Sequence, residues 1–262
     1  VVPTYGAWGD RTAILDGVQA AEALGFDTVW FGDHIVVPAY ATHLSPPNWF
    51  EPLACAFVAA GATRSIRFGV DVLVLPHRDP VWLSQLVAGA DQLSNGRLTL
   101  GVGIGYLEGE ASAMATTPYD RRGAVTDEYL AVLDALWTTD GPVSFHGEWT
   151  SFDDVVAEPK PLQDPMPVWV GGNAPAAVRR AARLGTGWHP LFPDLARYRT
   201  DRSRILELRA EDGRTSDFTF SYSTFATRVT TSSADPGISH GPPSDRPVPA
   251  EYGYAPAPPT TA

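Results

Sequence analysis

Short apolar runs alternate with longer amphipathic stretches along most of the chain. The apolar runs predict a first strand ending near Tyr5 and six further strands at 27–31, 66–74, 98–102, 167–170, 186–189 and 218–229. The stretches between them carry apolar residues at helical spacing and predict helices at 11–24, 52–63, 80–93, 121–137, 176–184 and 194–210. Strands that alternate with helices in this way indicate an α/β fold built from right-handed βαβ units.

Two α/β architectures fit this alternation, a (β/α)8 barrel of the TIM type and a doubly wound open sheet. Several predicted strands end in glycine or polar residues, as in 101–105 and 171–173. This favours the barrel, in which the C-terminal strand ends carry the chemistry. Residues 141–165 alternate like a small hairpin and end in a proline-rich stretch, so we expect an excursion from the barrel there.

The C-terminal segment has a different composition. From Ser232 onward Pro, Gly, Ser and Thr dominate, and such a segment cannot bury enough apolar surface to fold. We therefore expect a barrel over residues 1–231 and a disordered, proline-rich tail over 232–262. Because the tail stands where an eighth strand belongs, we expect a barrel that is incomplete at its C-terminus.

Composition and charge limit the classes of partner. Hydrophobic residues make up 44% of the chain and charged residues 19%, which is typical of a globular protein. The formal net charge of −11 argues against a nucleic acid or an anionic membrane as partner. The chain shows no secretory signal and no bilayer-length apolar run. Its single cysteine, Cys55, lies in an apolar run, and we expect an inert packed thiol and a cytoplasmic location.

Asp33 and His34 are the first candidates for chemistry, because they directly follow the apolar run Thr28–Phe31. Histidine exchanges protons near neutral pH, and a neighbouring carboxylate can fix its tautomer or hold a ligand. The alternative is a histidine that only bonds a loop carbonyl. The histidines of the chain lack the spacing of metal ligands, so we predict no metal site.

Asp71 and the strand-end glycines form a second group of candidates. Asp71 interrupts an apolar strand, so its carboxylate must be paired, face a cavity or lie at a backbone irregularity. The glycines at 101–105 and 171–172 either allow a backbone to approach a ligand or form tight turns. Gly171-Gly172-Asn173 is the stronger signal, because a helix begins just after it and would favour an anion.

Five ordered motifs resemble the bacterial-luciferase-like flavin and deazaflavin oxidoreductases. They lie at 25–34, 73–80, 91–106, 121–128 and 168–173, so the resemblance extends over about residues 3–200. It implies a TIM barrel with insertions after strand four and before strand five. It also implies coenzyme F420, or FMN as the alternative, at the C-terminal mouth of the barrel.

The resemblance also implies roles for individual residues. His34 would be the acid or base nearest the cofactor ring, and Asp33 would hydrogen-bond the ring or orient His34. A non-prolyl cis peptide at Asp71–Val72 would brace the back of the ring. Contacts to the ring edge and the phosphate would come from Gly105, Tyr106, Gly171, Gly172 and Asn173.

We therefore predict an F420-dependent oxidoreductase that transfers hydride between the deazaflavin and a small organic substrate. A homodimer is compatible with this prediction. The alternatives are an FMN-dependent monooxygenase on the same barrel and a truncated barrel without activity. In the related sugar-phosphate dehydrogenases, a Trp follows the His by four residues and a Glu lies in the strand-four loop. Here Pro38 and Tyr106 occupy those places, so a sugar phosphate is not the expected substrate.

Overall fold

The computed structural model describes residues 2, 4–6, 9–43, 45–114 and 116–223. Within these ranges six parallel strands form one sheet, in the order β1-β2-β3-β6-β7-β8. Their bounds are β1 (Thr28–Phe31), β2 (Arg67–Val74), β3 (Leu98–Gly103), β6 (Val168–Gly171), β7 (Gly187–His189) and β8 (Thr219–Phe220). The strands follow one another in chain order, and no reversal interrupts them.

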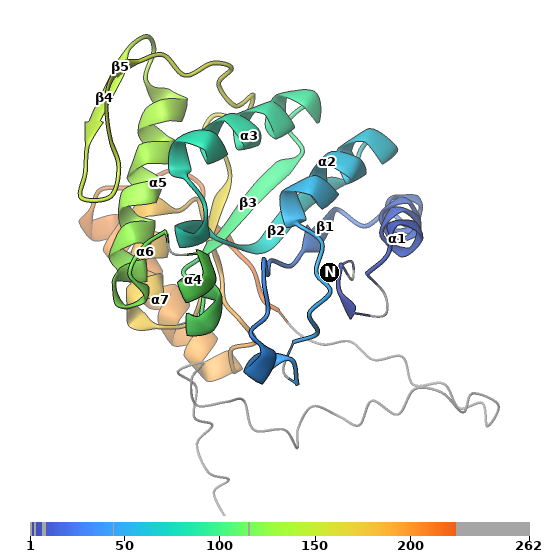
Figure 1. The fold of residues 1–262 in the computed structure, drawn as a ribbon. Coiled ribbons are helices and arrows are strands. Elements are labelled where there is room, and N and C mark those ends of the chain that lie inside the picture. Colours follow the sequence, from blue (N-terminus) through green and yellow to red (C-terminus); the bar gives the residue numbers. More distant parts are fainter. Residues whose placement is uncertain (1, 3, 7–8, 44, 115, 224–262) are drawn as a thin grey trace, which may run out of the picture.

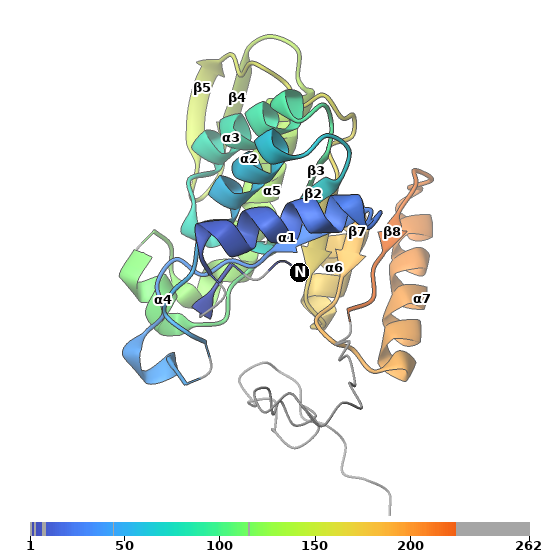
Figure 2. The ribbon, with the colours of Figure 1, turned by 90° about the vertical axis from the view of Figure 1, so that its right-hand side faces the viewer.

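Apart from the short α4, the helices of the described residues form a single layer outside the sheet (Figures 1 and 2). Each helix contacts the next along the chain, from the first to the last. A doubly wound sheet reverses its strand order and has helices on both faces, so the structure excludes that alternative. Over the described residues β1 and β8 are the two edges of the sheet, which confirms the predicted barrel architecture that is incomplete. The helices are α1 (Arg11–Ala23), α2 (Pro52–Ala62), α3 (Pro80–Leu93), α5 (Arg122–Thr138), α6 (Pro175–Leu184) and α7 (Leu195–Glu211).

Most helices begin at an acidic residue that caps the first turn. The side chains of Asp10, Glu51, Asp79 and Asp194 each accept a hydrogen bond from the backbone N–H three residues further on. Such a cap satisfies one of the unpaired N–H groups at the start of a helix. α5 and α6 differ, because Arg121 and Ala174 precede them and make no side-chain cap bond.

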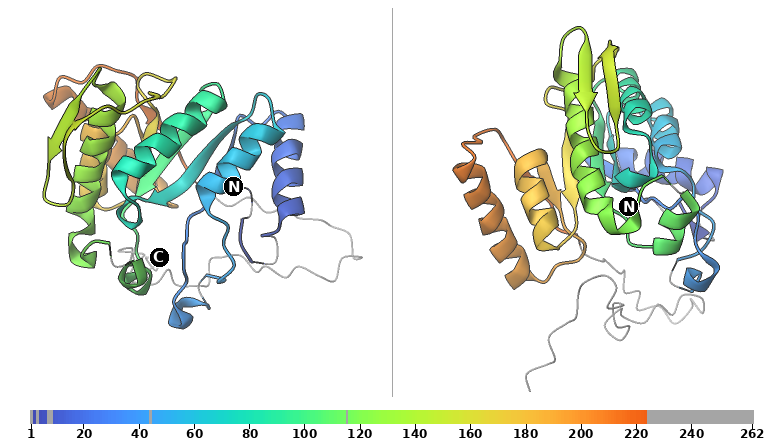
Figure 3. Two further views of the ribbon diagram at one scale, coloured as in Figure 1. Left: turned by 45° about the horizontal axis from the view of Figure 1, so that its top comes forward. Right: turned by 60° about the vertical axis from the view of Figure 1, so that its left-hand side comes forward.

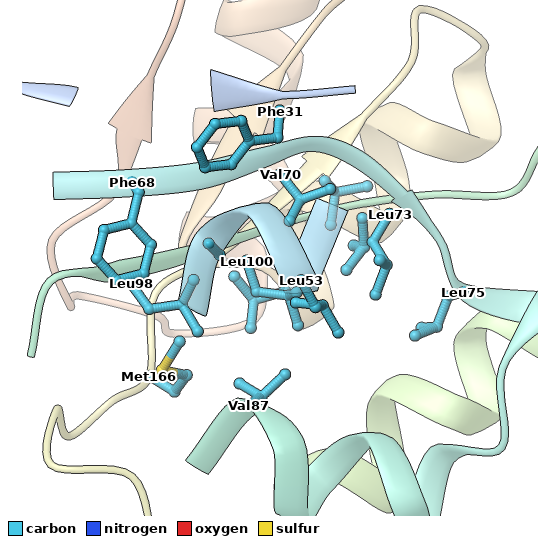
Figure 4. Packing of buried hydrophobic residues seen from close by; sticks show 14 of the residues in the cluster. Phe31, Leu53, Phe68, Val70, Leu73, Leu75, Val87, Leu98, Leu100 and Met166 are labelled. Atoms are coloured by element: carbon cyan, nitrogen blue, oxygen red, sulfur yellow. The ribbon is translucent and has the colours of Figure 1, made fainter. Parts of the chain in front are cut away.

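The main hydrophobic core lies between the sheet and the outer helices. Figure 4 shows Phe31 of β1 and Phe68 of β2 beside Leu98 of β3, with Leu53 of α2 and Val87 of α3 facing them. All five side chains are almost completely removed from solvent. Burial of these side chains explains why the apolar runs of the sequence form the strands of the sheet.

On the opposite face, large side chains of the sheet pack over glycines of the neighbouring strand. Trp30 pairs in register with Gly69, where an added Cβ would lie 2.4 Å from the indole ring. Trp169 pairs with Gly187, where the corresponding distance is 2.5 Å. The two indole rings also contact each other, with centroids 5.1 Å apart. Glycine is therefore required at positions 69 and 187 to make room for the indoles.

The excursion predicted over 141–165 contains an antiparallel hairpin, β4 (Val143–His146) and β5 (Ser151–Val155), as expected. It stands beside α5 and outside the barrel sheet (Figure 3). Val143 packs there against Val132 and Leu136 of α5, which gives the hairpin a small core of its own.

Three parts of the sequence prediction differ from the structure or lie outside it. The short helix α4 (Glu108–Met114) and the 3₁₀ turns Ala39–Ala41, Leu75–His77 and Tyr119–Arg121 were not predicted. Near the N-terminus, in place of the expected strand, Val2 N donates to Trp30 O, Phe50 N donates to Thr4 O and Gly6 N donates to Asn48 O, and Tyr5 and Trp49 form an isolated antiparallel bridge. Positions 224–229 of the last predicted strand and the whole tail lie outside the described residues, so the division at residue 231 stays a prediction.

No helix among the described residues is both long enough and apolar enough to cross a membrane.

Cys55 lies on α2 in the main core, where it is only 4% exposed. Burial, with a smaller effect of the Glu51 charge, raises the pKa of its thiol from 9.0 to about 11. Because the thiolate is the reactive form, we expect native Cys55 to react with a disulfide reagent at pH 8 roughly 100-fold more slowly than a free thiol. A reagent titration of native and urea-unfolded protein checks this, and equal rates in the two states would contradict it.

Candidate functional site

His34 lies just beyond the C-terminal end of β1 and is engaged at both ring nitrogens. Its Nδ1 is 2.9 Å from Oε2 of Glu110, and its Nε2 is 3.1 Å from the hydroxyl of Tyr106. Tyr106 follows β3 and Glu110 belongs to α4, so the loop after β3 supplies both partners. The imidazole is largely buried and also meets the Trp49 ring edge-on. These contacts make the C-terminal edge of β1 and β3 the centre of the candidate site.

Glu110 is a buried carboxylate, with only 2% of its surface exposed. While Oε2 faces His34, Oε1 accepts hydrogen bonds from the backbone N–H groups of Ile35 and Val36, at 2.7 and 3.3 Å. Burial alone would raise the pKa of Glu110, but the bonds from His34 and Ile35 outweigh it, and the pKa lies below its ordinary value. The side chain is therefore a carboxylate at neutral pH.

A carboxylate can only accept hydrogen bonds, and this fixes the tautomer of His34. In the neutral imidazole the proton must lie on Nδ1, which donates to Glu110. Nε2 is then an acceptor, and the Tyr106 hydroxyl donates to it. The hydrogen-bond network thus prepares His34 to receive a proton at Nε2.

The backbone around Tyr106 is held from the following segment. The hydroxyl of Tyr119 donates to the carbonyl of Tyr106 at 2.8 Å, and Nε of Arg122 donates to the carbonyl of Gly105 at 3.2 Å. The Arg122 guanidinium lies 3.9 Å from the centroid of the Tyr119 ring. Gly105 has φ = +74°, a conformation that favours glycine. These contacts hold the backbone from which the Tyr106 side chain extends toward His34.

Asp33 points to a different partner, Arg78. The guanidinium binds both carboxylate oxygens, at 2.7 and 2.8 Å, and the Val74 N–H donates to Oδ2 at 2.8 Å. Arg78 also reaches Glu51 at 3.0 Å. Burial would lower the pKa of Arg78, but the charge of Asp33 raises it above its ordinary value. Glu110, rather than Asp33, therefore contacts the imidazole, and a role of Asp33 at a cofactor ring stays a prediction.

The peptide bond between Asp71 and Val72 is cis, as predicted. The register between β2 and β3 shifts at the same point, between Val70 and Leu73. The Asp71 carboxylate is also paired, because Oδ1 lies 2.8 Å from Nε2 of His189 at the end of β7. Asp71 is thus both paired and located at a backbone irregularity, which are two of the three environments expected from the sequence.

His189 connects this carboxylate to the last described strand. Its Nδ1 lies 2.6 Å from the Ser221 hydroxyl, directly after β8, and its ring stacks on Trp30 at a centroid distance of 5.2 Å. The sequence pattern had singled out neither His189 nor Ser221. Together with Asp71 they form a polar row across β2, β7 and the segment after β8.

Some of the strand-end glycines are explained by packing against Val72. An added Cβ would lie 2.5 Å from Val72 at Gly103 and 2.8 Å from it at Gly171. Glycine at positions 103 and 171 therefore leaves space for the Val72 side chain, and this explains these glycines without a ligand. The assignment of Gly171 to phosphate binding stays a prediction.

Gly172 and Asn173 shape the loop before α6. Gly172 has φ = +105°, and its carbonyl accepts a bond from Nε1 of Trp188. The amide of Asn173 bonds the backbone of Leu191 twice, at 2.6 and 3.0 Å. The Asn173 side chain thus joins two loops, while the backbone N–H groups at the uncapped start of α6 remain available to an anion.

Among the described residues, no group of three or more His, Cys, Asp or Glu side chains could hold a metal ion.

Comparison with known proteins places the chain in a family. The family described as luciferase-like monooxygenase matches residues 3–235. The F420-dependent glucose-6-phosphate dehydrogenase of Amycolatopsis mediterranei (strain U-32) is 32% identical over 184 residues, which cover 69% of this chain and 53% of that protein. The FMNH2-dependent dimethylsulfone monooxygenase of Pseudomonas putida is 30% identical over 145 residues, or 54% of this chain and 39% of that protein.

A solved structure agrees in fold. An F420-dependent secondary alcohol dehydrogenase, in complex with an F420–acetone adduct, matches with a TM-score of 0.71 and 24% identity, over 80% of this chain and 63% of that chain. The chain thus spans between about two fifths and two thirds of the length of these three proteins. The family match extends over most of the sequence, from residue 3 to residue 235. The chain belongs to the luciferase-like monooxygenase family.

Proposed function

We propose that this protein is an F420-dependent oxidoreductase, which transfers hydride between the deazaflavin and a small organic substrate. The observation that carries the proposal is the position of His34, between Glu110 and Tyr106 at the C-terminal edge of the sheet. A histidine held in one tautomer beside a buried carboxylate suits the proton transfer that must accompany movement of a hydride. The 32% identity to an F420-dependent dehydrogenase supports the choice of cofactor.

The residues at this edge fit such a cofactor. The cis bond at Asp71–Val72 and the side chain of Val72 would support the ring, and Gly105 and Tyr106 would line its edge. The uncapped start of α6, after Gly171-Gly172-Asn173, would receive the phosphate. His77 adds a buried Nδ1 that has no partner among the described residues, and its ring lies close to Gly105. A buried group without a partner in the protein marks a place where a ligand or water can bond.

The chain's own residues position the reactants and move the proton. Bound F420 supplies a carrier for two electrons as hydride, and the protein supplies orientation and electrostatics. Nε2 of His34 takes up a proton when an alcohol is oxidised and returns it when a carbonyl is reduced. The Glu110 carboxylate stabilises the imidazolium that forms. The Asp33–Arg78 pair holds the end of β1 against the end of β2.

We expect the protein to bind F420 in preference to FMN. Fluorescence titration with each cofactor measures the two dissociation constants, and a screen of alcohols and carbonyls with the preferred cofactor then identifies the substrate class. Tight FMN binding with negligible F420 binding would contradict the proposal.

The second candidate is an FMN-dependent monooxygenase on the same barrel, and the similarity to the dimethylsulfone monooxygenase favours it. Reduced FMN would then be consumed together with O2 in the presence of substrate, whereas F420 would have no effect. Binding of either cofactor without turnover of any substrate would favour the third alternative, a barrel without activity.

A further inference from the structure

We infer that Tyr106 is the residue that exchanges a proton with the substrate oxygen, while His34 relays that proton and Glu110 positions His34. The inference rests on the proposed function and assigns separate roles to the three side chains of this site. It changes the expected identity of the acid and base, because a histidine at a strand end would ordinarily be assigned direct contact with the substrate.

The hydrogen bonds of the imidazole indicate that the substrate does not contact His34 directly. Nδ1 of His34 is held by Glu110 and Nε2 by Tyr106, so both nitrogens already have partners within the protein. A substrate oxygen could reach Nε2 only by displacing the Tyr106 hydroxyl. The bonds from Arg122 and Tyr119 to the Gly105 and Tyr106 carbonyls hold the backbone of this loop in place beside His34.

The exposure of the three side chains indicates that the substrate contacts Tyr106. His34 is 9% exposed and Glu110 only 2%, whereas Tyr106 is half-buried. Exposure therefore increases along the row from Glu110 through His34 to Tyr106. The side chain at the exposed end is the one that a bound substrate can touch.

The proton balance follows from this order. In alcohol oxidation, the substrate hydroxyl gives its proton to the Tyr106 oxygen as Tyr106 gives its own proton to Nε2 of His34. The C–H bond breaks with its electron pair going to F420 as hydride, and the C=O bond forms. Carbonyl reduction runs the same transfers in reverse, with Tyr106 donating to the substrate oxygen and His34 restoring the tyrosine proton.

Glu110 prepares His34 to act as the base behind Tyr106. A free phenol loses its proton only near pH 10, so Tyr106 needs a base behind it to work at neutral pH. The carboxylate keeps the proton on Nδ1, which leaves Nε2 open toward Tyr106 and stabilises the charged imidazole. A neutral side chain of the same shape at position 110 removes both effects.

Substitution of Tyr106 tests the inference. We expect Tyr106→Phe to lower kcat by roughly 10²–10⁴-fold, the range for loss of a general acid or base, with the dissociation constant for F420 changed by less than about threefold. Tyr129→Phe is the matched control, because Tyr129 is a buried tyrosine of α5 outside the site, and it should keep the parent kcat. Parent-like kcat in Tyr106→Phe, alongside a large loss in His34→Ala, would show that His34 acts directly and would overturn the inference.

A measurement without cofactor tests the positioning role of Glu110. Nitrogen-15 NMR of the free protein should show His34 with its proton on Nδ1. In Glu110→Gln the amide can still accept from Ile35 while its N–H group donates to Nδ1, so the imidazole proton should move to Nε2. We also expect this variant to lose most of kcat and to show a shifted pH profile. Parent His34 with its proton on Nε2, or an unchanged tautomer and pH profile in Glu110→Gln, would contradict the relay.

Failure of the proposed function can be distinguished from failure of the inference about Tyr106. If the parent protein neither binds F420 nor turns over a substrate with it, the proposed function is wrong and the inference falls with it. If the parent protein does both and Tyr106→Phe is equally active, only the inference is wrong.

Discussion

Replacement of Arg78 by methionine should lower the free energy of unfolding by about 3–5 kcal/mol, the range for removing one partner of a buried ion pair. Arg78 and Asp33 are 8% and 7% exposed, and the guanidinium binds both oxygens of the carboxylate. In Arg78→Met the Asp33 carboxylate stays buried without its counter-charge, with only the Val74 N–H beside it. Urea unfolding followed by tryptophan fluorescence measures the loss.

A double variant separates the ion pair from general packing. Asp33→Asn combined with Arg78→Met removes both charges and keeps an acceptor for the Val74 N–H, so it should recover a large part of the loss. Arg204, which is about half exposed and pairs with Glu207 on the surface of α7, provides the control, and Arg204→Met should leave the urea midpoint of unfolding close to that of the parent protein. If Arg78→Met were as mild as this control, the buried pair would contribute nothing to stability.

Replacement of His34 by alanine should lower turnover by roughly 10²–10⁴-fold, which corresponds to about 3–5 kcal/mol in the activation barrier. The substitution removes the acceptor of the Tyr106 hydroxyl and the partner of Glu110. Glu110 keeps its bonds to Ile35 and Val36, so we expect the fold and cofactor binding to survive. Steady-state kinetics and the F420 dissociation constant provide the measurement.

His43→Ala is the matched control for this experiment, because His43 is an exposed residue of the loop after Ala39–Ala41. It should behave like the parent protein in both assays. If His34→Ala also kept parent turnover, His34 would be a structural residue, and the alternative of a histidine that only satisfies hydrogen bonds would hold.

The positions of most helices and strands could be predicted from the sequence, because the signals for them are local. α3 begins and ends where predicted, at Pro80 and Leu93, since Asp79 caps it and Pro80 suits its first turn. α4 could not be predicted, because it is short and its sequence shows no apolar stripe. The contact that holds it, from Glu110 to Ile35 and Val36, joins residues more than 70 positions apart.

The candidate site was predicted only in part, for a similar reason. His34 and the Asp71–Val72 bond could be identified, but adjacency in the sequence suggested Asp33 as the partner of His34. Both residues lie beyond the end of β1, where Asp33 bonds Arg78 while His34 bonds the loop after β3. The actual partner, Glu110, lies 76 positions away, and no spacing rule reaches that far.

The packing of Val72 against Gly103 and Gly171 has a consequence for how this barrel can vary. The three positions come from three different strands, yet the Val72 side chain limits the space at both glycines. A larger residue at either glycine position would be tolerated only after Val72 had become smaller. Substitutions at these positions would therefore accumulate in a fixed order, first at 72 and then at 103 or 171, and the glycines would be retained across relatives even where the cofactor changed.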